Sequence, residues 1–68
     1  MEVFKIQKSL TDNNVLAYNK DRSIIGEFVI SKELSELFGN ELKIYVLGKY
    51  NENTKSVDII KKVDEKKW

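Results

Sequence analysis

The chain has 68 residues and a formal net charge of +1, with 41% hydrophobic and 34% charged side chains. This balance is typical of one folded domain and too apolar for a disordered chain, and no apolar run is long enough to span a membrane as a helix. Because histidine and cysteine are absent, the sequence excludes disulfides, Cys/His zinc sites and the nucleophile–base pairs built on these side chains.

Two short strands are predicted at the start of the chain. Residues 2–10 alternate between apolar and polar side chains, with Leu10 extending the apolar face. Residues 11–14 are rich in Asp and Asn, which favour turns because their side chains bond nearby backbone. Residues 15–19 then form the second strand.

A third strand is predicted over residues 24–30, after a polar turn at residues 19–23. Apolar side chains occur on both of its faces, so we expect it to be a central strand covered on both sides. Gly26 in its middle indicates a bulge or a sharp bend, as at the corner of a small barrel.

One short helix is predicted between Ser31 and Gly39. Ser31 is a suitable N-cap, because its hydroxyl can accept a hydrogen bond from a free amide of the first turn. Leu34, Leu37 and Phe38 form one narrow apolar stripe, and Gly39 can adopt the left-handed conformation that ends a helix. A helix of about two turns is not stable alone in water, so it must pack on the sheet.

Two more strands are predicted over residues 42–50 and 57–63, joined by the polar turn 51–55, before a charged tail at residues 64–68. The whole chain, residues 1–68, is then a single α+β domain, mostly β, in the order β-β-β-α-β-β. That order fits a five-stranded OB-like barrel, with its helix between strands three and four, or an open antiparallel sheet with the helix across one face. The sequence leaves both open.

No group of side chains in the sequence predicts catalysis. Ser31 lacks the flanking glycines and the His partner of a nucleophile elbow, so we interpret it as a cap. Glu33 and Glu36 lie on the solvent side of the helix, where they solvate it. No glycine-rich loop leads into a helix to bind phosphate. We therefore expect a protein that is not an enzyme and binds no cofactor or metal.

The best candidate binding residues lie in the fourth and fifth predicted strands. Tyr45 lies between Lys43 and Lys49 on the face opposite the core residues, as in a stacking platform for single-stranded nucleic acid. Lys61 and Lys62 add positive charge. The alternative is that Tyr45 packs under the helix or against the C-terminal tryptophan.

Trp68 ends the chain after a charged run. It either folds back onto a groove or anchors a partner protein, since tryptophan is enriched at interface hot spots.

The leading hypothesis is a small, non-enzymatic interaction protein that binds another protein or a second copy of itself; the alternative is a nucleic-acid-binding module. A homodimer would also add stability to so small a core. No leader precedes the first strand, so we expect a cytoplasmic protein without a membrane partner.

One resemblance rests on Tyr18-Asn19-Lys20-Asp21-Arg22-Ser23 together with the terminal Trp68. This pair of features resembles uncharacterised small proteins of phages and other mobile elements. The resemblance implies a short accessory protein and no defined activity.

A second resemblance covers residues 26–46, which are similar to the strand–helix–strand unit of AbrB-type swapped-hairpin regulators. Gly26-Glu27-Phe28-Val29-Ile30-Ser31-Lys32-Glu33-Leu34 and Leu42-Lys43-Ile44-Tyr45-Val46 carry the similarity. Those regulators are dimeric DNA-binding proteins. Their proline is replaced here by Ser31, and their arginines correspond to Glu27, Ser35 and Glu36. The resemblance therefore implies a fold, while the family's DNA contacts lack their side chains.

Overall fold

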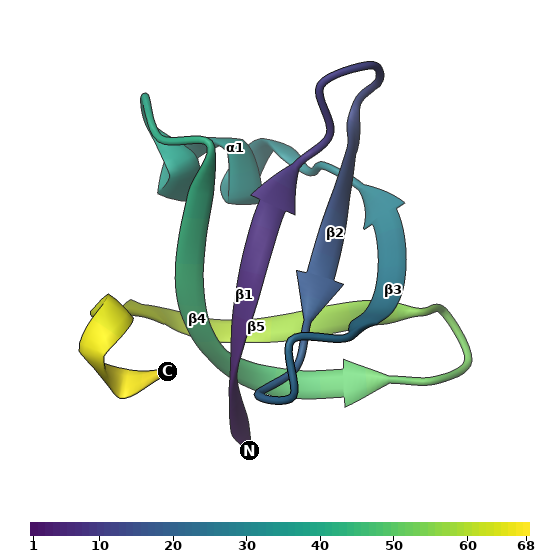
Figure 1. Cartoon of the computed structure of the whole chain (residues 1–68). Helices are drawn as coiled ribbons and strands as arrows, with labels where there is room; N and C mark the ends of the chain where they lie inside the picture. The colour runs from purple at the N-terminus through teal and green to yellow at the C-terminus, as the bar shows by residue number, and fades with distance from the viewer.

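The computed structural model describes all residues, 1–68, and contains five strands and one α-helix (Figure 1). The elements are β1 (Glu2–Lys8), β2 (Asn14–Tyr18), β3 (Ile24–Val29), α1 (Lys32–Phe38), β4 (Lys43–Asn51), β5 (Ser56–Val63) and a 3-10 turn, η1 (Glu65–Lys67). The predicted order β-β-β-α-β-β is confirmed, as is the single short helix between the third and fourth strands.

The five strands form one antiparallel sheet in the order β3-β2-β1-β4-β5. β4 bends strongly, so that β5 runs behind β1 and β2 and the two edges of the sheet approach each other (Figure 1). β3 and β5 contact each other, yet no backbone ladder joins them. The sheet is therefore an OB-like barrel that remains open between β3 and β5.

The prediction that the third strand is central is wrong. β3 pairs only with β2, and Ile24 and Val29 on its outer side are 57% and 70% exposed. The central strand is β1, which pairs with β2 on one side and β4 on the other. A strand with apolar residues on both faces can be a central strand covered on both sides, or an edge strand whose outer apolar side chains are exposed. The sequence pattern alone does not distinguish the two.

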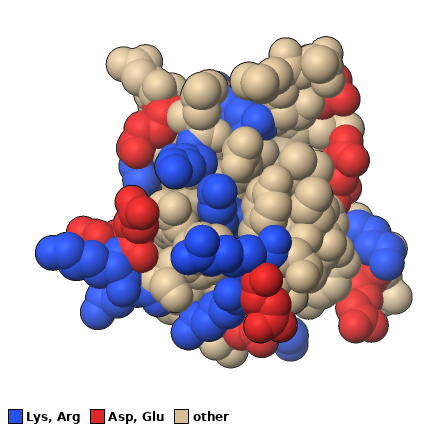
Figure 2. Space-filling model, viewed as in Figure 1, with Lys and Arg blue, Asp and Glu red and all other residues tan.

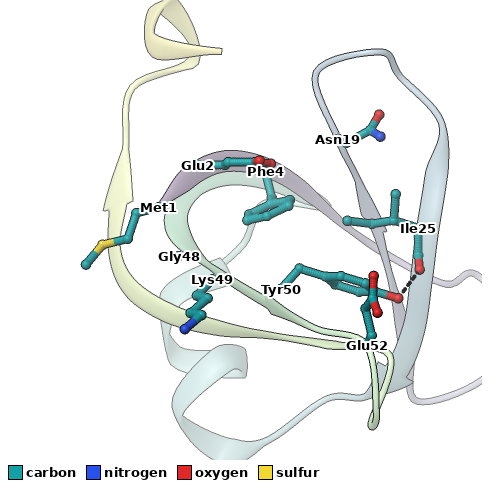
Figure 3. Close-up of a pocket in the computed structure, with 9 residues that line it drawn as sticks. All are labelled: Met1, Glu2, Phe4, Asn19, Ile25, Gly48, Lys49, Tyr50 and Glu52. Atoms are coloured by element: carbon teal, nitrogen blue, oxygen red, sulfur yellow. Dashed lines mark hydrogen bonds between the residues drawn. The ribbon is translucent and has the colours of Figure 1, made fainter.

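At the end of the barrel away from the helix, side chains and the β4–β5 turn close the gap between β3 and β5. The Tyr50 hydroxyl donates a hydrogen bond to the carbonyl of Ile25 (Figure 3). Ile25 is the extra residue of a bulge, one position before the predicted irregularity at Gly26. A Cβ at Gly26 would collide with the carbonyl oxygen of Lys55, so glycine permits the turn to approach β3.

At the other end of the barrel, α1 packs against the core in the predicted way. The Ser31 hydroxyl accepts a hydrogen bond from the Leu34 amide at 3.1 Å, and Gly39 has the positive φ of 58° that ends the helix. Leu34 and Phe38 are buried, so the helix covers this end of the barrel as a plug.

The core lies inside the curled sheet, beneath α1. Its fully buried members come from β1, β2, α1, β4 and β5: Phe4, Ile6, Val15, Ala17, Leu34, Phe38, Ile44, Val46 and Val57. Leu10 and Leu42, which the alternation assigned to the apolar faces of strands, are instead 85% and 60% exposed. Both lie beyond the ends of their strands, where the alternation of faces no longer applies. None of the helices has the length and hydropathy needed to cross a bilayer.

Candidate functional site: an aromatic and basic face

The register of the sheet aligns three side chains on its outer face. Lys5 in β1 lies opposite Tyr18 in β2 on one side and opposite Tyr45 in β4 on the other. Directly paired residues point to the same face of a sheet. Tyr18, Lys5 and Tyr45 therefore form a row across β2, β1 and β4, on the side away from the core.

Tyr45 is only 7% exposed although it lies outside the core cluster. Its cover is the C-terminal tail. The Asp64 carboxylate accepts a hydrogen bond from the Lys66 amide at 2.9 Å and starts the turn η1, which brings Trp68 back over the sheet. The rings of Tyr45 and Trp68 then lie 5.3 Å apart between centroids, at 47°. Of the two arrangements expected for Trp68, the structure has the folded-back one.

The indole of Trp68 is half-buried, and its Nε1 is the buried side-chain polar atom that lacks a hydrogen-bond partner. An unpaired buried N–H costs about 1–3 kcal/mol. Packing of the indole on Tyr45 and its contacts with nearby cations must therefore contribute more free energy than this unpaired N–H costs, since the tail lies folded back on the sheet.

Two cations from different elements converge on this indole. The Lys5 Nζ lies 5.9 Å from the centre of the Trp68 ring and 5.1 Å from that of Tyr18, and the Arg22 guanidinium lies 5.3 Å from the Trp68 ring. Arg22 lies in the β2–β3 turn, at a φ of 65°, and its amide donates to the Asn19 carbonyl at 2.9 Å. We call Lys5, Tyr18, Arg22, Tyr45 and Trp68 the aromatic–basic face.

Neither cation of the aromatic–basic face is neutralised by a carboxylate. The structure contains one ion pair, between Lys62 and Glu41 at 3.0 Å, and it lies elsewhere. Each cation–π contact at an exposed site contributes about 0.5–1 kcal/mol. These contacts therefore compensate part of the mutual repulsion between Lys5 and Arg22. They leave the net positive charge in place.

Three of the predicted lysines share the outer face with Tyr45. Lys43 lies two residues before Tyr45 on the same strand, and Lys61 lies opposite Leu47, which is outward-facing. Lys49 also faces outward, opposite Asp58, further along β4. Figure 2 shows the result: Lys and Arg side chains gather over β1 and β4, and uncharged surface covers most of β2 and β3.

Lys62 does not belong to this surface. It lies opposite Val46, whose side chain is in the core, and it forms the ion pair with Glu41 after the helix. Of the two arrangements expected for Tyr45, the structure has the alternative one, in which its ring packs against Trp68. Tyr45 is therefore a support for the indole and offers no free face for a ligand to stack on.

The sequence interpretation missed Lys5, Tyr18 and Arg22. Lys5 and Tyr18 alternate out of phase with the core residues of their own strands, which was a signal that they face outward. Nothing in the sequence indicated that the β1–β2 and β1–β4 registers align them with Tyr45, or that the turn bearing Arg22 lies beside the tail.

The structure also contains a hollow outside the aromatic–basic face. Phe4, Ile25 and Tyr50 point into a cavity of about 410 Å³ at the end of the barrel away from the helix, with Glu2 and Glu52 at its rim (Figure 3). Nowhere in residues 1–68 do three or more Asp or Glu side chains gather as metal ligands would. The aromatic–basic face is thus the best-defined candidate site.

Comparison with protein-family models, with curated proteins and with solved structures found no match to this chain. The function must therefore be argued from the residues of the aromatic–basic face themselves.

Proposed function

We propose that this protein is a non-enzymatic binding module that holds single-stranded nucleic acid on its aromatic–basic face. The observation that carries the proposal is the convergence of Lys5 and Arg22 on Trp68 with no carboxylate to neutralise either. A phosphate group would relieve the repulsion between the two cations and release counterions from the nucleic acid.

The rings beside these cations favour single strands over duplexes. Single-strand binders combine a basic surface with aromatic rings on which unpaired bases stack. Tyr18 is half-buried, and the Lys5 ammonium lies over its ring, 5.1 Å from the ring centre. A base that stacks on Tyr18 would displace this ammonium group, which could then contact the phosphate of the same nucleotide. Lys43 and Lys61 extend the positive surface along the strand direction of β4 and β5. The OB-like barrel is a scaffold on which such surfaces occur.

Protein binding led the hypotheses drawn from the sequence because catalytic motifs are lacking, the charge is balanced and Trp68 had no obvious place in the core. With Trp68 packed on Tyr45, that reason no longer applies to the tail. A nucleic-acid ligand is compatible with the cytoplasmic location expected from the sequence and with the accessory role implied by the resemblance to small phage proteins.

The test is titration of the protein into a fluorescein-labelled 15-nucleotide oligothymidine, followed by anisotropy at 20 mM and 200 mM NaCl. We expect binding at low salt that weakens at high salt, with a log–log slope of about −0.7 for each phosphate contacted. Replacing Lys5 and Arg22 together by Gln should reduce this slope by about 1.4. Tyr18→Ala should weaken binding by about 1–3 kcal/mol if a base stacks there.

The matched control is Lys62→Gln, which removes one positive charge from the opposite side of the sheet. It should leave both affinity and salt slope nearly unchanged. An anisotropy that does not change at 20 mM NaCl with 100 µM protein would refute the proposal. A loss for Lys62→Gln as large as that for Lys5→Gln would show that net charge, and not this face, determines binding.

A further inference from the structure

A second surface lies where the barrel is open, between the edges of β3 and β5 and beside the first turns of α1. It is a groove of about 400 Å³. Its main apolar lining comprises Phe28, Val29, Leu34, Leu37, Ile59 and Ile60. Phe28, Leu37 and Ile59 are half-buried and pack on the core, so they form the floor. Val29 and Ile60, at the rims, are 70% and 59% exposed.

The β3 side of this groove has free backbone hydrogen-bonding groups. The Ile30 amide donates to the Asn13 carbonyl at 2.8 Å, so these two residues form a hydrogen-bonded pair between the ends of β3 and β2. In an antiparallel ladder the next residue points its backbone groups the other way. The N–H and C=O groups of Val29 and Glu27 therefore point away from β2, toward the open edge. Such an edge can pair with an added strand.

The charges of the groove are unbalanced. Its charged lining residues are Glu33 from α1 and Asp58 and Lys61 from β5, and none of them lies within 4.0 Å of an opposite charge. Lys49 lies directly opposite Asp58 on β4, so Glu33 is the carboxylate of the groove that has no cross-strand cation beside it. An occupant with basic side chains would complement this charge, and an acidic occupant would be repelled.

We propose that this groove receives an extended, basic segment of a partner protein, which adds a strand to the free edge of β3. Its apolar side chains, at every second position, would fill the space above Phe28, Leu37 and Ile59. A second copy of this chain could offer one of its two edge strands, β3 or β5. Pairing two β3 edges would bring like charges together, because Glu27 is the single charged residue of β3. The β5 edge borders the same groove in its own copy, so pairing through β5 is tested below as an alternative outcome.

The experiment uses a heptapeptide of alternating valine and lysine, titrated into isotopically labelled protein and followed by amide chemical shifts. We expect saturable shifts at residues 27 and 29 and along β5, with little change at Lys5 or Trp68. The same peptide with glutamate in place of lysine should bind at least several-fold more weakly. A version with proline at alternate positions, which cannot pair with an edge strand, should not bind.

Two variants test the charges. Glu33→Gln and Asp58→Asn should each weaken binding of the valine–lysine peptide by about two- to five-fold, the range expected for an exposed ion pair. Glu36→Gln is the matched control, since Glu36 is an exposed carboxylate on the same helix that does not line the groove. Far-UV circular dichroism verifies that all three variants are folded.

Three results would overturn this inference: no shifts at millimolar peptide, equal binding of the lysine and glutamate peptides, or shifts confined to the aromatic–basic face. Concentration-dependent dimerisation through β3 or β5, seen by sedimentation, would replace the partner protein by a second copy and also refute it. Lys61 borders both surfaces, but none of the five residues of the aromatic–basic face lines the groove. Failure of this proposal therefore leaves the oligothymidine result unaffected.

Discussion

The Tyr50 hydroxyl donates a hydrogen bond to the backbone carbonyl of Ile25, and this bond joins the end of β4 to β3. These two strands lie on opposite sides of β1 in the sheet and share no backbone ladder. A single side chain therefore supplies a connection that main-chain hydrogen bonds provide in a closed barrel.

Tyr50→Phe should lower the free energy of unfolding by about 1 kcal/mol, because it removes this hydrogen bond and keeps the packing of the ring. Urea unfolding followed by circular dichroism measures the change. Tyr18→Phe is the control, since the Tyr18 ring lies on the outer face of the sheet. If the two variants are equally stable, the Tyr50–Ile25 bond contributes nothing to closure.

Gly26→Ala should destabilise the fold by about 1–3 kcal/mol, the range for overpacking a tight contact. The new Cβ would collide with the Lys55 carbonyl oxygen, which is backbone and cannot rotate away. The β4–β5 turn must then move off β3, so amide shifts should concentrate at residues 51–56. A variant as stable as the original chain, with no shifts in this turn, would contradict the close approach.

Trp68 and Tyr45 should be energetically coupled. In a double-mutant cycle with Trp68→Ala and Tyr45→Leu, we expect a coupling of about 0.5–1.5 kcal/mol in unfolding free energy, as for other aromatic pairs. Trp68 is the one tryptophan of the chain, so its fluorescence reports directly on the tail. Emission should shift to longer wavelength in Tyr45→Leu, and additive single effects would mean that the rings do not interact.

Trp68→Phe should cost much less stability than Trp68→Ala. Phenylalanine retains a ring over Tyr45 and removes the buried Nε1–H that has no hydrogen-bond partner. Thermal unfolding is suitable, because about 1 kcal/mol corresponds to roughly 4–8 °C in a domain of this size. Equal losses for Phe and Ala would contradict the prediction that ring packing on Tyr45 holds the tail.

Ser31→Ala should cost about 1 kcal/mol through loss of the cap on α1, and Ser31→Asp should restore most of it. The control is Ser35→Ala, which lies on the exposed side of the same helix and should change stability by less than about 0.5 kcal/mol. Chemical denaturation of the three variants gives the comparison. Loss in Ser35→Ala alone would show that α1 does not depend on its cap.

The helix and the existence of all five strands followed from local sequence. Ser31, Gly39 and the apolar stripe between them specify α1 through hydrogen bonds and packing within a few residues. Strand boundaries were correct to within one or two residues, because turn-forming Asp and Asn residues separate the alternating segments. Leu10 and Leu42 were wrongly included in strands, because the apolar pattern extends past the limits of the strands, after the end of β1 for Leu10 and before the start of β4 for Leu42.

The candidate site was only partly predictable. Tyr45, Lys43 and Lys61 share the outer face of the sheet, as alternation within β4 and its pairing with β5 imply. Lys5 and Arg22 could not be assigned to the same place, since Lys5 reaches Tyr45 through the β1–β4 register and Arg22 reaches Trp68 through the fold of a turn.

The sequence by itself determined the kind and order of the elements, because caps, turns and hydrophobic periodicity act over a few neighbouring residues. Only the tertiary structure decided that β1 is central and β3 an edge, that the barrel stays open, and that Trp68 covers Tyr45. Those features depend on which strands pair and in which register, and that choice depends on the free energy of the whole core rather than on any single segment.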